Sequence, residues 1–234
     1  MMPGAGELLL AVAPPPTWRV IAWSSLAIAA ACAVGIACDV AFFRRQRMGI
    51  MNVVWPITAL YAGPLALLAY VTIGRAPARG GGHRVRPMGL AALIGATHCG
   101  AGCAVGDVIM DTALFLAGAE TLLGPPLLTA YVFDFIAAYL FGILFQYFAI
   151  APMRDLSPRQ GIIAAVKADT LSLVAFQIGM YAWMAVYQLL LFHPPLHPDS
   201  PVYWFMMQIG MLAGLATSYP MNWFLVVRGI KEAM

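Results

Sequence analysis

Residues 88–117 read MGLAALIGATHCGAGCAVGDVIMDTALFLA, an apolar run that also carries one imidazole, two thiols and two carboxylates. The run is longer than the roughly 20 residues that a helix needs to cross the hydrocarbon core of a bilayer. In a helix, four of these polar side chains recur at every fourth position and form one stripe: Cys99, Cys103, Asp107 and Asp111. His98 lies about 100° round the helix from Cys99. The run therefore predicts a membrane span with polar groups at membrane depth.

Composition extends this prediction to the whole chain. Of its 234 residues, 62% are apolar and 10% are charged, and the mean hydropathy is +0.82. Globular domains have roughly 45–50% apolar and about 25% charged residues, so the chain is expected to be an integral membrane protein. The net charge of +3 comes mostly from arginines in loops, which is a topology signal. The lipid bilayer is the expected partner, and nucleic acid is not.

Hydrophobic periodicity predicts an all-α fold, a polytopic membrane helix bundle of about six transmembrane helices. The expected spans are residues 17–43, 51–74, 88–117, 122–150, 158–192 and 202–227. Residues 1–16 form an N-terminal tail, and residues 17–234 form a single transmembrane domain. Pro56, Gly63 and Pro64 interrupt the second span, so we expect a kink there, with neighbouring helices satisfying the freed carbonyl groups.

Lysine and arginine in the loops predict the orientation. Six spans place both chain ends on one side, and the basic loops that begin at Arg75 and Arg154 predict that this side is cytoplasmic. The expected location is the bacterial inner membrane, with multiple passes. The cluster Arg44 to Arg47 falls on the opposite side and contradicts the rule. We expect an ion pair between Asp39 and Arg44 or Arg45.

The stripe on the third span suggests a metal site. Thiolates and thioethers suit Cu(I), and imidazole suits copper, zinc and iron. The predicted ligands are His98, Cys99, Cys103 and Asp107, with Met207 and Met211 of the last span as auxiliary ligands at similar depth. Four further polar residues are expected to assist metal binding. Asp111 and Asp134 are chosen for their depth in the membrane, and His193 and His197 for their position in the predicted outer loop. Asp134 is expected near the depth of His98. Copper is the leading candidate, and another transition metal stays open.

Other readings of the same residues remain open. A buried cysteine is often a small hydrophobe, and methionine often fills gaps in a core. Cys99 and Cys103 suit disulfide exchange with a quinone in a membrane redox enzyme, although residues four apart in a helix need distortion to bridge. A third class is a non-catalytic subunit of a larger complex or a homo-oligomer, in which the polar stripe holds helices together. Whether the protein is an enzyme stays open.

Four segments together resemble one known family. They are MNVVWPITALY at residues 51–61, the HCxxGC element at residues 98–103, KADTLSL at residues 167–173 and WFMMQIGMLAGLATSYPMN at residues 204–222. The resemblance is to the membrane family catalogued as domain of unknown function 4396. It implies a small polytopic membrane protein, found mainly in prokaryotes, whose activity is not established. Some relatives carry copper-oxidase-like names, and the family supplies no catalytic residue.

Overall fold

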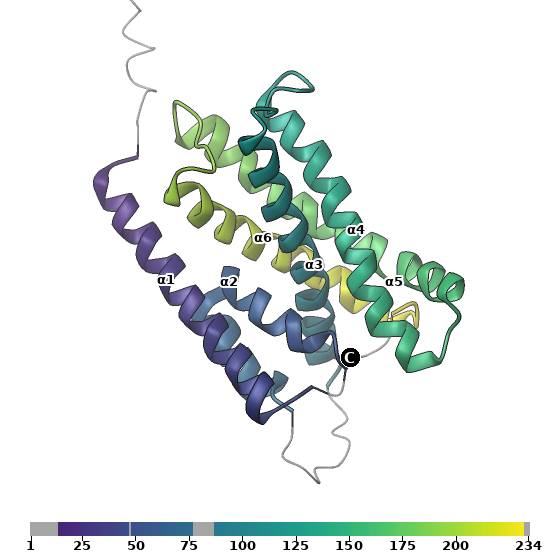
Figure 1. Cartoon of the computed structure of the whole chain (residues 1–234). Helices are drawn as coiled ribbons and strands as arrows, with labels where there is room; N and C mark the ends of the chain where they lie inside the picture. Colours follow the sequence, from purple (N-terminus) through teal and green to yellow (C-terminus); the bar gives the residue numbers. More distant parts are fainter. Residues whose placement is uncertain (1–13, 47, 77–86, 232–234) are drawn as a thin grey trace, which may run out of the picture.

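The computed structural model describes residues 14–46, 48–76 and 87–231, and it is helical throughout its regular parts. Six helices follow in order: α1 (Pro16–Cys38), α2 (Met51–Ala69), α3 (Met88–Leu116), α4 (Pro126–Arg154), α5 (Pro158–Val186) and α6 (Pro201–Val227) (Figure 1). Short π-helical turns extend α1, α2 and α5, at Asp39–Phe43, Tyr70–Gly74 and Tyr187–Leu191. The predicted all-α bundle is confirmed. Most of the predicted N-terminal tail lies outside the described residues.

Local sequence signals set where several helices begin. Proline stands at the start of α1, α4, α5 and α6, where its missing N–H costs no helical hydrogen bond. At α5, Ser157 and Gln160 form a capping box in front of Pro158. The fourth helix begins at Pro126, four residues later than expected from Leu122, because a residue before proline is disfavoured in helical conformation.

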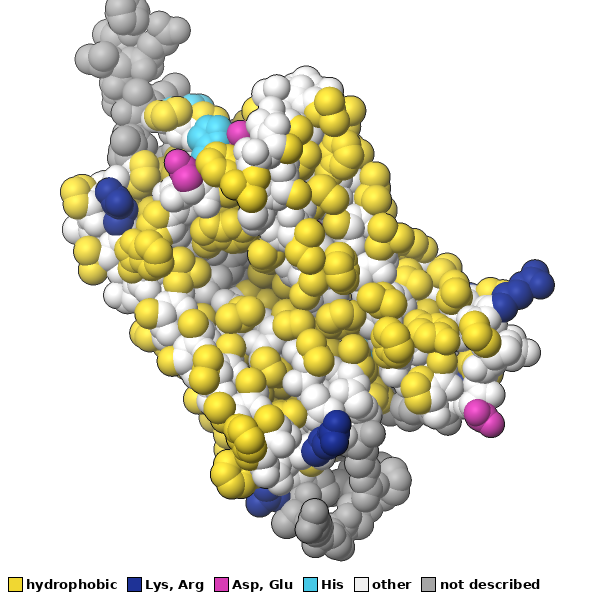
Figure 2. Space-filling model, in the orientation of Figure 1, with side chains coloured by type: hydrophobic (Ala, Val, Ile, Leu, Met, Phe, Trp, Pro, Cys, Tyr) yellow, Lys and Arg dark blue, Asp and Glu magenta, His cyan; other side chains and the backbone are white. Residues whose placement is uncertain are grey.

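The helices are suited to a lipid environment. Five of them, with their π-helical turns, are long and apolar enough to cross a membrane: α1, α2, α3, α4 and α5. α6 has 27 residues, and it carries the buried polar side chains of Gln208, Ser218 and Asn222. Large hydrophobic side chains cover the face shown in Figure 2, and most charged side chains lie towards its margins. The protein is a multi-pass membrane protein.

α3 lies at the centre of the bundle. In its most apolar 18-residue stretch 72% of the residues are buried, against 22% in α1. It runs antiparallel to α4 and packs closely on it, because glycine at 102 and 106 leaves room for the other backbone. A Cβ atom added at Gly102 would lie 2.9 Å from the Cα atom of Gly142, and one at Gly106 would collide with the backbone of Ala138. Small residues at helix interfaces in membranes allow this kind of close backbone approach.

α2 is broken and folds back on itself. Gly63 has φ +51° and ψ −126°, and Pro64 follows it. The ring of Trp55 packs edge-on against Tyr70 at 5.6 Å between centroids and also contacts Gly74. In a straight helix, residues 55 and 74 are separated by about 28 Å. The expected kink is therefore a reversal, and residues 51–62 and 64–74 form a re-entrant hairpin.

A polar side chain of α6 stabilises the tip of this hairpin. Pro64 has no N–H group, so the carbonyl oxygen of Leu60 lacks its helical donor. The Nε2 atom of Gln208 donates to that oxygen at 2.7 Å, and its Oε1 atom accepts from Ser25 at 2.7 Å. The expectation that a neighbouring helix satisfies a freed carbonyl is confirmed here.

The re-entrant hairpin changes which segments share an end of the bundle. Arg75, directly after α2, forms an ion pair with Asp39 at the end of α1. At the other end, the ring of Trp18 near the start of α1 packs against Phe192 and Phe205. The start of α1 and the end of α6 therefore lie at opposite ends of the bundle (Figure 1). The prediction that both chain ends lie on one side of the membrane assumed that the second span crosses the bilayer completely.

Asp39 also corrects a predicted ion pair. Its carboxylate accepts from Arg75 and from the hydroxyl of Tyr70 at 2.6 Å, and Arg44 instead donates to the carbonyl of Ala76. The hydrogen bonds that Arg75 donates to Asp39 raise the pKa of Arg75 above its usual value. The partner differs from the expected Arg44 or Arg45 because the fold-back of α2 brings Arg75 to Asp39.

Candidate functional site

The predicted polar stripe of α3 is buried along its whole length. His98, Cys99, Cys103 and Asp107 are fully buried, and Asp111 is 4% exposed. The helix is regular through this stretch, so residues at every fourth position do share one face. Polar groups at membrane depth are costly and mark functional sites more often than packing positions. The stripe divides into three parts with different neighbours.

The first part is a cluster of three carboxyl groups near the loop between α3 and α4. Gln177 of α5 donates through Nε2 to Oδ1 of Asp107 at 3.2 Å. Asp111 interacts with Asp134 of α4 and with the hydroxyl of Tyr203 of α6. Within the described residues, neither oxygen of Asp134 has a hydrogen-bond partner of normal geometry. Asp134 thus lies with Asp107 and Asp111, and not beside His98 as expected, because α3 and α4 are antiparallel and Gly106 lies opposite Ala138.

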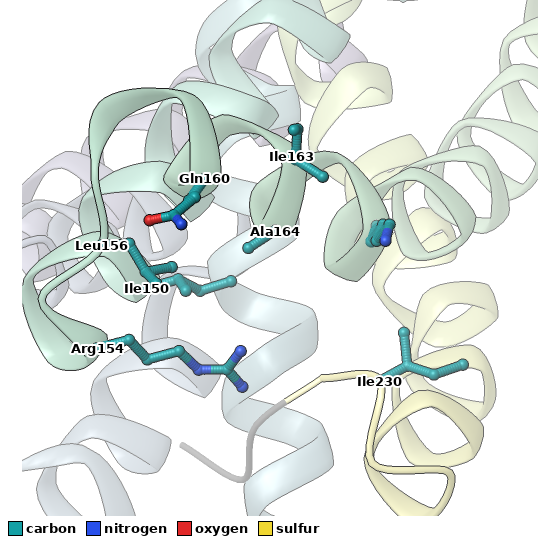
Figure 3. A pocket seen from close by; sticks show the side chains of 8 residues that line it. Ile150, Arg154, Leu156, Gln160, Ile163, Ala164 and Ile230 are labelled. Carbon is teal, nitrogen blue, oxygen red and sulfur yellow. The ribbon is translucent and has the colours of Figure 1, made fainter.

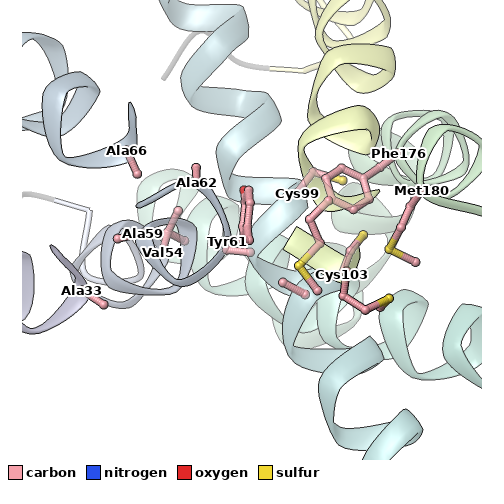
Figure 4. Packing of buried hydrophobic residues seen from close by; sticks show 14 of the residues in the cluster. Ala33, Val54, Ala59, Tyr61, Ala62, Ala66, Cys99, Cys103, Phe176 and Met180 are labelled. Carbon is pink, nitrogen blue, oxygen red and sulfur yellow. The ribbon is translucent and has the colours of Figure 1, made fainter. Parts of the chain in front are cut away.

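The second part is a sulfur-rich core in the middle of α3. The thiol of Cys103 lies next to that of Cys99, and both cysteines are free. Figure 4 shows them beside Phe176 and Met180 of α5, with Tyr61 approaching from α2. The auxiliary residues of α6 are buried in the same core. Met207 accepts a hydrogen bond from Tyr187 at 3.6 Å, and Met211 lines a cavity with it.

The third part surrounds His98. Nζ of Lys231, which follows α6, forms a fully buried ion pair with Asp169 of α5 at 3.0 Å. Nearby, Asn222 donates to Ser172 at 2.6 Å. His98 lies within electrostatic range of both Lys231 and Asp169, and its ring packs edge-on against Phe145. Among the described residues, neither ring nitrogen of His98 has a hydrogen-bond partner.

Sequence reasoning missed Lys231 and its pairing with Asp169. Both side chains are fully buried against each other. Gly95 lies beside this pair, since a Cβ atom added there would be in ordinary contact with Cε of Lys231 at 3.7 Å. A lysine four residues beyond a helix end has the sequence signature of an exposed tail, so no local signal indicates its burial.

The four predicted ligands do not converge on one point. Nowhere in residues 14–46, 48–76 and 87–231 are three or more His, Cys, Asp or Glu side chains arranged to hold a metal ion. His98 lies beside the Lys231–Asp169 pair. Asp107 accepts a hydrogen bond from Gln177 and lies within electrostatic range of Cys103. In the loop between α5 and α6, His193 contacts the carbonyl of Leu189, and His197 contacts Glu120 at 3.2 Å. The two histidines have separate partners.

A cleft lies on the lipid-facing side of the sulfur-rich core. It has a volume of about 310 Å³ and lies between α1, α3 and α6, beside the part of α2 just before its reversal at Gly63. Tyr61, Met207, Gln208 and Met211 form its inner wall. Figure 2 shows this face hollowed between α1 and α3. The thioether side chains of α6 are therefore close to a lateral opening of the bundle.

The helices and the buried stripe define a class, a helical multi-pass membrane protein with a polar central helix. The chain belongs to the family described as Domain of unknown function (DUF4396), whose model matches residues 90–231. The match spans α3 to α6 and includes every residue of the stripe, while α1 and α2 lie outside it. No curated protein and no solved structure matches the chain.

Proposed function

We propose that this protein binds a soft monovalent metal cation, Cu(I), and moves it across the membrane along α3. The observation that carries the proposal is the adjacent, fully buried pair of thiols, Cys99 and Cys103, in a core that also holds methionines. Thiolate and thioether groups select Cu(I) over harder cations. A cation with this preference is held by thiolates and thioethers, so His98, which lies beside Lys231 and Asp169, is not required as a ligand.

The order of groups along α3 supports movement as well as binding. Asp107, Asp111 and Asp134 form an acidic cluster at one end, and the thiols follow further in. Carboxylates at an entrance raise the local concentration of cations. Beyond the thiols, Asp169 is a further anionic group, and Lys231 already balances its charge. In this arrangement the cation passes from carboxylates to thiols without leaving the buried face of α3.

Cu(I) binding to the purified protein under reducing conditions tests the proposal. We expect the wild type to take Cu(I) from a competing chromogenic chelator. Even outer partners of a metal ligand contribute about 10–100-fold to affinity, so a Cys99→Ser/Cys103→Ser variant is expected to lose more than about 100-fold. The matched control is Cys32→Ser/Cys38→Ser, which removes the same number of thiols from α1 and should bind as the wild type does.

Two results would overturn the copper proposal: no Cu(I) bound by the wild type, or equal binding by both double variants.

A second function, proton transfer, is favoured by one observation. The carboxyl oxygens of Asp134 and the ring nitrogens of His98 are buried without hydrogen-bond partners in the described part of the chain. Proton flux into liposomes that Asp134→Asn stops, in a protein without Cu(I) affinity, would replace the copper proposal with this one.

The orientation that we propose places the basic end of the bundle in the cytoplasm of a bacterial inner membrane. One end of the bundle holds the segment between α1 and α2, the end of the α2 hairpin, the α4–α5 loop and the residues after α6, and it carries Arg44, Arg45, Arg75, Arg154, Arg159 and Arg228. With α2 re-entrant, the arginines that contradicted the positive-inside rule join the others. The start of α1 then faces outwards. A reporter fused after residue 231 should be active only in its cytoplasmic form, and the reverse result would refute the orientation.

A further inference from the structure

We infer that a cavity at the basic end of the bundle binds the phosphate headgroup of an anionic phospholipid. The cavity has a volume of about 380 Å³ and lies between the end of α4, the first turns of α5 and the residues after α6 (Figure 3). Two cationic side chains line it, Arg154 from α4 and Lys167 from α5. The site is separate from the buried stripe of α3, so the inference does not depend on the proposed function.

The lining combines charge with apolar walls. Apart from Arg154, Lys167 and Gln160, the lining residues are apolar: Ile150, Leu156, Ile163, Ala164 and Ile230. Figure 3 shows Arg154 extending from the end of α4 towards the space below Ala164, with Ile230 on the far side. Ile163 and Ile230 are about half exposed, so their side chains continue the apolar surface that faces lipid. A soluble anion gains nothing from such walls, whereas the glycerol and upper acyl chains of a lipid do.

The position of the two cations fits a membrane boundary. Lys167 lies about 14 Å along α5 from Pro158, at the rise of about 1.5 Å per residue. Lys167 and Arg154 line the cavity beside apolar side chains. Long cationic side chains near helix ends lay their alkyl stems along apolar surface and extend their charge to the polar region of a bilayer. Oε1 of Gln160 accepts from the backbone and hydroxyl of Ser157, so the α5 cap uses the oxygen of this amide and not its NH2 group. Basic pockets between transmembrane helices on the cytoplasmic side recognise anionic headgroups.

Lipid titration of the full-length protein in neutral detergent, followed by native mass spectrometry, tests the inference. We expect phosphatidylglycerol to bind more tightly than phosphatidylcholine, and inorganic phosphate not to compete. Each cation near an anionic lipid contributes about fivefold to affinity, so Arg154→Gln/Lys167→Gln should weaken phosphatidylglycerol binding about 25-fold. The matched control is Arg159→Gln/Arg228→Gln, which removes two exposed charges from the same end without touching the cavity.

Charge-conserving changes separate binding from folding. Arg154→Lys/Lys167→Arg keeps both cations and should keep phosphatidylglycerol binding within a few-fold of the wild type. Equal loss in the cavity variant and the Arg159/Arg228 control would overturn the inference. So would equal binding of the two lipids by the wild type, a result that requires no variant to fold. Displacement of the lipid by inorganic phosphate would show a site for soluble anions instead.

Discussion

Replacing Lys231 with methionine is expected to lower the free energy of unfolding by about 3–5 kcal/mol, the range for breaking a buried ion pair by removal of one partner. The change leaves Asp169 fully buried with no cation at 3.0 Å. Methionine fills the space of the lysine stem beside Gly95, so lost packing contributes little. Unfolding by denaturing detergent, monitored by circular dichroism, measures the difference.

The double variant Lys231→Met/Asp169→Leu separates charge from structure. Apolar replacement of both partners of a buried pair is often neutral or stabilising, so we expect most of the lost stability to return. Lys167→Met is the matched control, because Lys167 is exposed on the same helix as Asp169 and should change stability by less than about 0.5 kcal/mol. Equal losses of stability in the Lys231 single variant and the double variant would show that the pair stabilises the fold through packing and not through charge.

Gly63→Val is expected to cost at least about 3 kcal/mol, the upper range for a residue held in a rare backbone conformation. The φ of +51° with ψ of −126° is accessible to glycine, and a β-branched side chain there is a severe outlier. Gly35→Val in α1 is the control, since no atom lies within 4 Å of a Cβ atom added there. Thermal unfolding in detergent compares the two variants. A cost at Gly63 no larger than at Gly35 would mean that the reversal does not need glycine.

Chemical crosslinking tests the same reversal directly. In a chain with its four cysteines changed to serine, Trp55→Cys/Gly74→Cys should be crosslinked by a short bis-maleimide, which adds one thiol at each end, because the two positions are close together. Trp18→Cys/Gly35→Cys on α1 should not react, since about 25 Å of straight helix separates them. Adding Gly63→Val should reduce the first crosslink. Reaction of the α1 pair, or no reaction of the α2 pair, would contradict a folded-back α2.

Local signals allowed the helices and their limits to be predicted. The capping box at Ser157 and the prolines at helix starts act within one turn, so their effect is readable from sequence. The burial of the α3 stripe followed from its spacing of four residues. Pro64 and Gly63 indicated a break in α2, because their effect on the backbone is also local. These features depend on residues that are close together in the chain.

What the sequence did not indicate depends on contacts between distant residues. The angle of the break at Gly63 is set by Trp55 packing on Tyr70 and by Asp39 meeting Arg75, and neither contact has a local signature. The neighbours of His98 and Asp134 depend on helix rotation and on which helices are antiparallel. Depth along a span placed Met207 and Met211 in the same core as the thiols, but it did not assign Asp134 to the correct cluster.

The re-entrant α2 also means that the two leaflets meet different amounts of protein. Both arms of the hairpin occupy the leaflet on the side of Arg75, and only α1 and α3 to α6 continue past Gly63. The cleft of about 310 Å³ opens where α2 ends, and Leu26, Val108 and Trp204 are among the side chains that line it. In a bilayer, a hydrocarbon tail or a helix of another chain fills that volume. The packing of this fold is thus completed from outside the chain on the side where α2 has turned back.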